Sequence, residues 1–436
     1  MTSVALPQLN NSRIVRAWCM YDWANSVYSL VITSAIFPIY YKAVAVTENG
    51  DMVNFLGFTL ENSVLYTYAL SFSFLVVAAI LPLLSGVADY AGKKKAFMKV
   101  FVITGSAACM GLFFFRDINT LEWGIFCSIM ASIGYSGSLV FYDAFLPEIV
   151  TIDRYDATSA RGYSMGYYGS VILMIVCLLI ITYFASFGFP TEGHAVRFTF
   201  LLVGIWWIGF SMITFRFMPE NPYGRTPEGN IWTKGYAELL KVWHSLKSSP
   251  DLKRYLLAFF FFNMGVQTVM YLATLFGTDV LRLDSSKLIL TILLIQLVAS
   301  VGAWLSAKFS SKYGNKTTLL LMIAIWIVVC VAAYFINTEF QFYALAFVVG
   351  MIMGGVQSLA RATYTKLIPA NAIDHASYFS FFDVTYNLSI VFGTFSYGLI
   401  NQITGSMRNS ALALAVFFII GMIALTQVKS ANLKKA

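Results

Sequence analysis

Four charged side chains lie deep inside long apolar stretches of this sequence. They are Asp22, Asp143, Arg361 and Asp383. A charge in apolar surroundings needs an opposite charge or contact with water, so each residue marks a candidate site for binding or ion transfer. Arg361 either clamps an anionic group such as a carboxylate, which its planar guanidinium suits, or forms a structural ion pair with Asp143 or Asp383. Asp22 either binds a proton or an amine, or belongs to a structural pair.

Polar residues recur at the spacing of one helix face in these apolar stretches. An unpaired polar group in hydrocarbon costs roughly several kcal/mol, so we expect these faces to line one shared interior. The faces comprise Asp22, Asn25, Ser26, Ser29 and Thr33; Ser132, Tyr135, Tyr142 and Asp143; Asn263, Gln267, Tyr271 and Thr274; and Gln357, Arg361 and Tyr364. The candidate solute ligands are Asp22, Asn25, Ser26, Tyr135, Asn263, Gln267, Gln357 and Arg361. Asp383 shares a similar face with Ser380 and Asn387, whereas Gln296 stands alone and is expected to hydrogen-bond a neighbour.

The elements that must hold these residues are transmembrane helices. Of the 436 residues, 58% are hydrophobic and 11% charged, whereas soluble domains have about 45–50% and about 25%, so a soluble globule is excluded. Stretches long enough to cross about 30 Å of hydrocarbon predict an all-α polytopic protein of twelve transmembrane helices. They run approximately over 17–41, 64–88, 97–115, 123–144, 162–187, 198–218, 255–278, 286–307, 317–336, 341–366, 377–402 and 410–427.

The distribution of Lys and Arg predicts the orientation of these helices. An even number of spans places both termini on one side, and the connections on that side carry 22 of the 29 basic residues, against six on the other side. Basic loops stay in the cytoplasm, so we expect both termini to be cytoplasmic and the first span to be retained. The formal charge of +8 then reflects topology, and no nucleic-acid partner is expected.

The two halves of the chain repeat one pattern. Gly92 and Gly314 are 222 residues apart, and so are Pro147 and Pro369. Each half therefore reads as a six-helix bundle related to the other by a pseudo-two-fold axis, as in many secondary transporters. The predicted units are 1–218, a cytoplasmic linker at 219–252 and 253–436, with an amphipathic helix near 236–246 in the linker. The repeat also matches Asn25 with Asn263, which we expect to face each other across a central cavity.

A loop motif follows the second span. Residues 86–95 read GVADYAGKKK and resemble the G-x-x-x-D-x-x-G-[RK]-[RK]-[RK] loop of the major facilitator superfamily, although Tyr90 stands where that family usually has Arg. The resemblance implies a conformational latch, with Gly86, Asp89, Gly92 and Lys93 as gating residues. We expect the Asp89 carboxylate to accept hydrogen bonds from a neighbouring helix N-terminus or to meet a basic residue. The second-half copy has Ser311 in place of the Asp, so an acidic latch is expected in one half only.

Further stretches narrow the resemblance to one branch. Residues 16–28, RAWCMYDWANSVY, residues 142–148, YDAFLPE, and residues 354–361, GGVQSLAR, are similar to the unknown-major-facilitator branch. That branch includes the fungal autophagy-related vacuolar amino-acid effluxers, and the similarity runs from Arg16 to about Tyr397. The resemblance implies a major facilitator fold in which helices one, four, seven and ten line the cavity.

The expected function is secondary transport of a small polar solute by alternating access. By resemblance the solute is an amino acid or similar zwitterion moved outward, with proton coupling through Asp22, Asp143 or Asp383 as an option. A multidrug or sugar carrier is the alternative within the superfamily. A non-transporting membrane sensor or scaffold is the alternative outside it, and predicts a blocked interior. An enzyme is not expected, since no nucleophile–base pair or P-loop is present. We expect a monomer in a cytoplasmic-type (inner) membrane, with no cofactor or metal.

Overall fold

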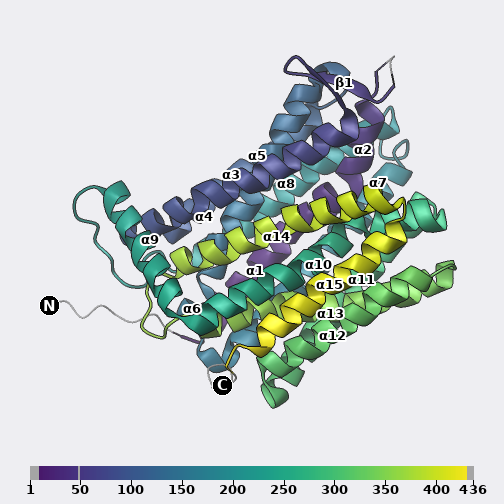
Figure 1. The fold of residues 1–436 in the computed structure, drawn as a ribbon. Helices are drawn as coiled ribbons and strands as arrows, with labels where there is room; N and C mark the ends of the chain where they lie inside the picture. Colours follow the sequence, from purple (N-terminus) through teal and green to yellow (C-terminus); the bar gives the residue numbers. More distant parts are fainter. Residues whose placement is uncertain (1–8, 48–49, 430–436) are drawn as a thin grey trace.

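Long, roughly parallel helices make up almost all of the chain in the computed structural model, which describes residues 9–47 and 50–429 (Figure 1). The first span consists of α1 (Ser12–Val27), a π-helical segment η1 (Tyr28–Ala35) and α2 (Ile36–Val44). The N-terminal half continues with α3 (Asn62–Ala91), α4 (Lys94–Gly111), α5 (Leu121–Asp143), α7 (Tyr155–Thr182) and α8 (Glu192–Phe217). The C-terminal half consists of α10 (Pro250–Leu281), α11 (Ser285–Tyr313), α12 (Asn315–Phe335), α13 (Glu339–Leu367), α14 (His375–Thr404) and α15 (Met407–Thr426).

These helices confirm the predicted twelve-helix fold. Ten helical stretches among the described residues are long and apolar enough to cross a membrane. Helices α10 and α14, of 32 and 30 residues, run beside them and complete the two bundles of six. Every apolar stretch predicted from the sequence falls on one of these helices.

Shorter elements connect the helices. They are the strands β1 (Met52–Phe55) and β2 (Phe58–Glu61), the helices α6 (Leu146–Ile149) and α9 (Ile231–Ser248), and the 3-10 segments η2 (Leu112–Phe114), η3 (Ile118–Thr120) and η4 (Ile152–Arg154). The two strands form an antiparallel hairpin, with Phe55 opposite Phe58, which the sequence analysis did not predict. The linker helix α9 extends beyond the predicted 236–246.

Both ends of the described chain lie at the same end of the bundle. The backbone N–H of Asn10 donates to the carbonyl of Ile149 (2.7 Å), and the Arg254 guanidinium donates to the carbonyl of Gln427 (3.2 Å). The loops around Gly92, Val150, Ser249, Gly314 and Pro369 lie at this end, here called the basic end. The opposite end carries the β1–β2 hairpin and is here called the hairpin end (Figure 1).

Local signals in the sequence explain where key helices begin and end. Helix α3 ends at Gly92, whose φ of 64° lies in the left-handed region that glycine adopts without strain. A β-carbon at Gly92 would also approach Asn221 Oδ1 to 2.6 Å. Helix α13 begins at a capping box of Thr338 and Gln341. These ends set the lengths of the helices that carry the polar faces.

Aromatic side chains pack inside both halves and belong to one continuous buried cluster. In the N-terminal half, fully buried Trp207 packs beside Tyr28, with ring centroids 5.8 Å apart. In the C-terminal half, Trp326 stacks on Phe418 at 5.4 Å. The polar faces of the helices point into the space between the halves, where the candidate site lies.

Candidate functional site

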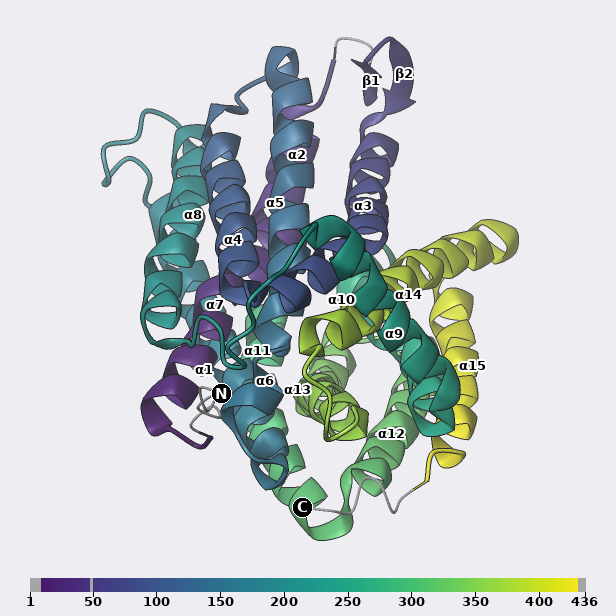
Figure 2. The ribbon, with the colours of Figure 1, turned by 90° about the vertical axis from the view of Figure 1, so that its left-hand side faces the viewer.

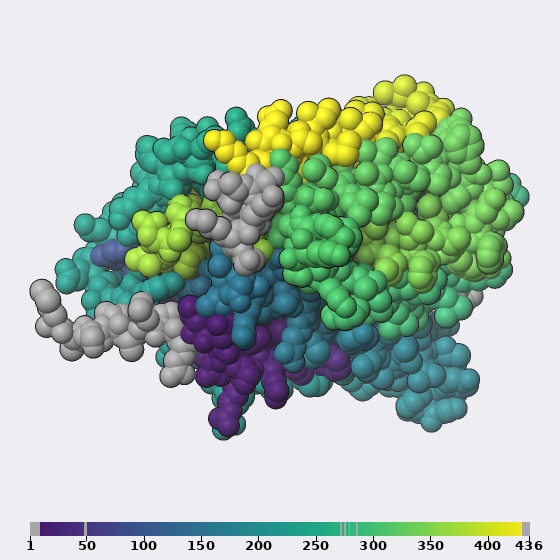
Figure 3. Space-filling view, turned by 90° about the horizontal axis from the view of Figure 1, so that it is seen from below, coloured from purple at the N-terminus to yellow at the C-terminus, as the bar shows by residue number. Residues whose placement is uncertain are grey.

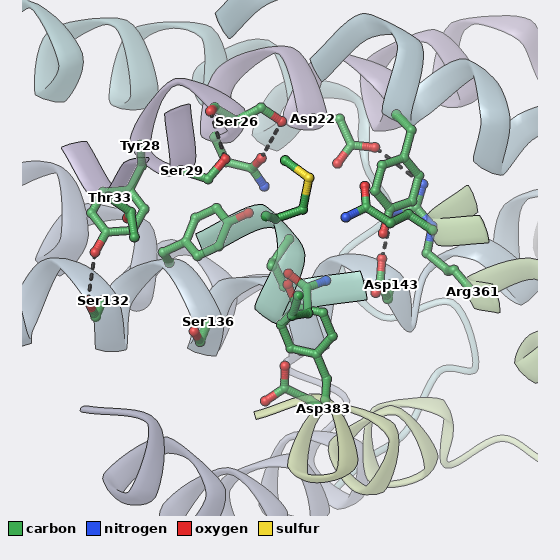
Figure 4. Close-up of a pocket in the computed structure, with 18 of the residues that line it drawn as sticks. Asp22, Ser26, Tyr28, Ser29, Thr33, Ser132, Ser136, Asp143, Arg361 and Asp383 are labelled. Carbon is green, nitrogen blue, oxygen red and sulfur yellow. Dashed lines mark hydrogen bonds and ion pairs between the residues drawn. The ribbon is translucent and has the colours of Figure 1, made fainter. Parts of the chain in front are cut away.

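A polar cavity of about 170 Å³ lies between the two halves (Figure 4). The first span, α3, α5 and α7 line it from the N-terminal half, and α10, α11, α13 and α14 line it from the C-terminal half. Its polar lining includes Asp22, Asn25, Ser26, Tyr28, Ser29, Thr33, Ser34, Ser132, Tyr135, Ser136, Asp143, Tyr163, Tyr167, Ser170, Gln267, Gln296, Gln357, Arg361, Asp383 and Tyr386. The polar faces predicted from helical spacing therefore meet in one space.

All but one of the predicted solute ligands line this cavity. Asp22, Asn25, Ser26, Tyr135, Gln267, Gln357 and Arg361 do so. The expectation for Asn263 is wrong: its amide donates to Ser389 Oγ (2.6 Å) and its Oδ1 accepts from Gln267 Nε2 (3.3 Å), so it lies in the contact between α10 and α14. The repeat matched the depth of Asn263, whereas the rotation of α10 turns it away from the cavity. The side chains of Tyr271 and Thr274 lie outside the described residues.

The contribution of α7 was not predicted from the sequence. Tyr163, Tyr167 and Ser170 line the cavity from this helix, and the Tyr167 hydroxyl donates to Gln357 Oε1 (2.7 Å). Their spacing of four and then three residues is that of one helix face, which is the signal that would have found them. Gln296 was expected to bond a neighbour, but it lines the cavity and its buried Oε1 has no partner among the described residues.

The Arg361 side chain, which is 2% exposed, connects α13 to three helices of the other half. Its Nη1 lies 2.9 Å from Asp143 Oδ1 and its Nη2 3.3 Å from Asp22 Oδ2. Its Nε donates to Ser159 Oγ (2.9 Å), and Nη2 also donates to the Ser159 carbonyl (3.1 Å). The predicted pair with Asp143 is therefore present, Asp22 joins it, and Asp383 does not.

Aromatic rings and a glycine fix this cluster in place. The Arg361 guanidinium lies 4.7 Å from the Trp18 ring centroid and 4.3 Å from that of Tyr163, within cation–π range. The Tyr142 hydroxyl donates to Asp22 Oδ2 (2.7 Å). A β-carbon at Gly162 would come within 2.4 Å of that same oxygen, so glycine is needed for α7 to approach. The cluster is thus closely packed on the side away from the cavity, which Asp22, Asp143 and Arg361 also line.

The predicted gating loop makes the helix-terminus contact expected of it. Asp89 accepts hydrogen bonds from the backbone N–H groups of Ala376 (3.3 Å) and Ser377 (2.7 Å) and from the Ser377 hydroxyl (2.8 Å). These groups belong to the first turn of α14, where the helix dipole favours a negative charge. Helices α3 and α14 thereby join the halves at the basic end (Figures 1 and 2).

The basic residue at this contact is Lys94, one position beyond the predicted Lys93. Lys93 is exposed, whereas buried Lys94 pairs with Glu148 and lies 4.0 Å from Asp89. Glu148 also contacts His375 Nδ1 (2.9 Å) at the start of α14. The helix α4 begins at Lys94, and its rotation points the second lysine of the motif inward.

Gly86 serves helix packing at the same end. Its β-carbon would lie 2.4 Å from the carbonyl oxygen of Gly235, so α3 and α9 approach through two glycines. Further along α9, the Tyr378 hydroxyl donates to Ser245 Oγ (2.7 Å). The linker helix therefore contacts α3 of one half and α14 of the other.

A second acidic contact joins the halves on the opposite side of the basic end. Asp156, in the first turn of α7, accepts from Ser310 Oγ (3.0 Å), Asn315 Nδ2 (2.7 Å) and Lys366 Nζ (2.7 Å). Like Asp89, this acid belongs to the N-terminal half, which agrees with the expectation of an acidic latch in one half only. Figure 3 shows the seam between purple and blue N-terminal surface and green C-terminal surface.

Hydrogen bonds between α7 and the C-terminal half continue this contact toward the cavity. Ser159 Oγ donates to the carbonyl of Ser358 (2.7 Å), and Ser164 Oγ donates to the carbonyl of Ser300 (3.0 Å). With the Asp89, Asp156 and Arg361 contacts, they hold the halves together at the basic end. The ribbons diverge toward the hairpin end (Figure 1).

Comparisons with known proteins agree with this architecture. Residues 10–436 match the family described as "Vacuole effluxer Atg22 like". The chain is 32% identical to the uncharacterized MFS-type transporter YxiO of Bacillus subtilis, over 94% of each protein. It is 22% identical to autophagy-related protein 22 of Yarrowia lipolytica, over 86% of this chain and 77% of that protein.

A solved structure shows the same fold. FucP, a major facilitator superfamily transporter in the outward conformation, superposes with a TM-score of 0.71 at 11% identity, over 96% of this chain and 98% of that one. The helix arrangement, the cavity between the halves and the sequence relatives therefore agree. This chain belongs to the Vacuole effluxer Atg22 like family and is a secondary transporter of the major facilitator superfamily.

Proposed function

We propose that this transporter moves a small polar solute, an amino acid or similar zwitterion, by alternating access of one central cavity. The observation that carries the proposal is the cavity itself: both halves line it with amides, hydroxyls and carboxylates, while ionic contacts hold the basic end shut. The conformation described here would then admit solute from the hairpin end. Opening of the Asp89, Asp156 and Arg361 contacts would expose the same cavity to the basic end.

The chemistry of the lining favours a hydrogen-bonding solute over a hydrophobic drug. Asn25 is 1% exposed, lines the cavity, and its Nδ2 has no acceptor among the described residues. Gln267 and Gln357 add two further amides from the C-terminal half. Buried polar groups of this kind fix the orientation of a polar ligand, whereas an apolar ligand would leave them unpaired.

The family supports the choice of substrate class. The resemblance to fungal vacuolar amino-acid effluxers favours an amino acid, and its movement out of the cytoplasm is part of the same proposal. The excess of Lys and Arg at the basic end favours a cytoplasmic location for that end and for both termini, in an inner-type membrane. Proton coupling through Asp22, Asp143 or Asp383, a monomeric state and the division at 1–218, 219–252 and 253–436 belong to the same proposal.

Transport by the purified protein tests this function. The full chain is reconstituted in liposomes, and uptake of each of the twenty radiolabelled amino acids is measured with and without a proton gradient, against protein-free liposomes. We expect saturable uptake of a subset of amino acids, and exchange when one of them is loaded inside. Uptake of hexoses or cationic dyes without any amino acid would contradict the proposal and favour the sugar or multidrug alternative.

Substitution of cavity amides tests the site independently of the direction of transport. Gln267→Leu or Asn25→Leu should weaken solute binding by about 1–3 kcal/mol, because polar groups of the solute lose partners. Isothermal titration on the folded protein measures this effect. Gln402→Leu, at an exposed position of α14, is the matched control and should leave affinity unchanged. If Gln267→Leu and Asn25→Leu bound the solute as tightly as Gln402→Leu, these two amides would not belong to the solute-binding site.

A further inference from the structure

Negatively charged side chains outnumber positively charged ones in the lining of the cavity. Among the described residues, its lining contains three carboxylates, on Asp22, Asp143 and Asp383, and one guanidinium, on Arg361. When all four are ionised, the lining carries a net charge of −2. Such a field attracts a cation and repels an anion.

Four of the five N–H groups of Arg361 already donate within the protein. Its three nitrogens contact Asp22, Asp143 and Ser159 at 2.9–3.3 Å. The rings of Trp18 and Tyr163 lie near the guanidinium, at 4.7 and 4.3 Å. A substrate carboxylate would have to displace Asp22 or Asp143 from the guanidinium. The anion-binding role suggested by the sequence is therefore already filled by the protein's own carboxylates.

Asp383 differs from the other two acids. It lies on the opposite wall of the cavity from Asp22 and Ser26, away from Arg361 (Figure 4). Asp383 is 8% exposed, and its Oδ2 accepts from Asn387 Nδ2 (2.7 Å), one turn along its own helix. No Lys, Arg or His among the described residues forms an ion pair with it. A carboxylate at membrane depth calls for an opposite charge, and the cavity is where one can reach it.

The surroundings of Asp383 suit an ammonium group. Phe379, Phe382 and Tyr386 of the same helix line the cavity beside it, and aromatic faces attract cations. An ammonium has three donors and no acceptor, so a carboxylate is a matching partner.

We propose that Asp383 is the counter-ion for a positively charged ammonium group of the transported solute. This inference rests on the proposed transport function and narrows its substrate class to solutes that carry an amine. The other end of the solute then faces the uncharged donors of the first span, such as Asn25 Nδ2, and a free carboxylate is not required. Arg361 acts as an ion-pair partner between the halves and does not contact the solute.

Matched ligands test the requirement for the amine. For the amino acid that the wild-type protein binds most tightly, two analogues are titrated into the full chain in nanodiscs: the amino-acid amide, which keeps the amine without the carboxylate, and the carboxylic acid that lacks the amine. We expect the amide to bind within about fivefold of the amino acid. The acid should bind at least about tenfold more weakly, because it has no partner for Asp383.

Variants at Asp383 test whether this residue causes the preference for ligands that carry an amine. Asp383→Asn preserves shape, and its Oδ1 can still accept from Asn387; it should weaken binding of the amino acid and its amide at least about tenfold. Asp383→Glu keeps the charge and should retain the preference for amines. Asp153→Asn, an exposed acid at the basic end, is the matched control and should bind like the wild type. Size-exclusion profiles in detergent verify that each variant is folded.

The outcomes separate this inference from the proposed function. Equal binding of the amine-free acid, or Asp383→Asn affinity within about twofold of wild type, would overturn the role of Asp383 while leaving amino-acid transport intact. Selective loss of the amine-bearing ligands would support it. Failure of the wild-type protein to bind or transport any amino acid would overturn the proposed function, and with it the inference that rests upon it.

Discussion

The two acidic contacts at the basic end occupy related places in the two repeats but use different chemistry. On one side, the Asp89 carboxylate meets two backbone N–H groups and one hydroxyl at the start of α14. On the other side, Asp156 meets side chains from three helices, including the ammonium of Lys366 at 2.7 Å. The first contact depends on a helix terminus, whereas the second is a buried ion pair.

The difference shows that the two repeats share the position of a contact, whereas the donor and acceptor groups differ between them. Ser311 stands where the repeat of Asp89 falls, yet it is exposed and its hydroxyl donates to Lys308 in its own helix. The neighbouring Ser310 provides the contact with Asp156 instead. Both acids come from the N-terminal half, so the C-terminal half supplies donors at both contacts.

The largest effect should come from Asp156→Asn. This change leaves the Lys366 ammonium buried without its charge partner, which costs about 3–5 kcal/mol, and should open the basic end. Spin labels at Arg161→Cys and Lys312→Cys report the distance between α7 and α11, since the native cysteines are buried. Adding Lys366→Met should restore most of the closed population. If Asp156→Asn alone left the protein as closed as the wild type, the ion pair between Asp156 and Lys366 would not be what holds α7 against α11.

Asp89→Asn should have a smaller effect of about 1–2 kcal/mol on closure, because charge–dipole stabilisation is lost while one amide oxygen still accepts. Exchange between conformations should change, and solute affinity should stay within about twofold, since Asp89 is not among the residues that line the cavity. Single-turnover transport and equilibrium titration separate the two quantities. A large loss of affinity at a normal exchange rate would contradict a gating role.

A matched pair of serine substitutions compares the two contacts directly. Ser310→Ala removes one of three donors from Asp156, and Ser377→Ala removes one of three from Asp89. Each should cost about 0.5–1.5 kcal/mol of closed-state stability, the usual value of one hydrogen bond. The same spin-label distances measure both. An effect confined to one serine would show that the other contact does not limit opening.

The smallest effect is expected for Ser311→Asp, which restores the acid that the repeat lacks. Because this position faces solvent, the change should alter the closed population by less than about 0.5 kcal/mol. Strong opening would mean that the new carboxylate reaches Asp156. Strong closing would mean that the position can act as a second latch.

Several features of the fold and site could be predicted because they depend on local sequence. Apolar length, the placement of Lys and Arg and the repeat of Gly92 and Pro147 predicted twelve helices in two bundles. Helical spacing predicted that Asn25, Gln267 and Gln357 face a polar interior. The loop motif predicted that Asp89 meets a helix N-terminus or a basic residue. Each of these follows from the period of a helix or the cost of burying polar groups.

Which of the possible partners on distant helices come together was decided by tertiary structure. Arg361 pairs with both Asp22 and Asp143, which lie 339 and 218 residues away in the sequence, and only the approach of α13 to α1 and α5 brings them together. Rotation of a helix about its own axis is likewise invisible in its sequence period. The rotation of α10 turns Asn263 toward Ser389, and that of α4 brings Lys94 inward while Lys93 stays exposed. The rotation of α14 places Asp383 at the cavity, without an ion-pair partner among the described residues.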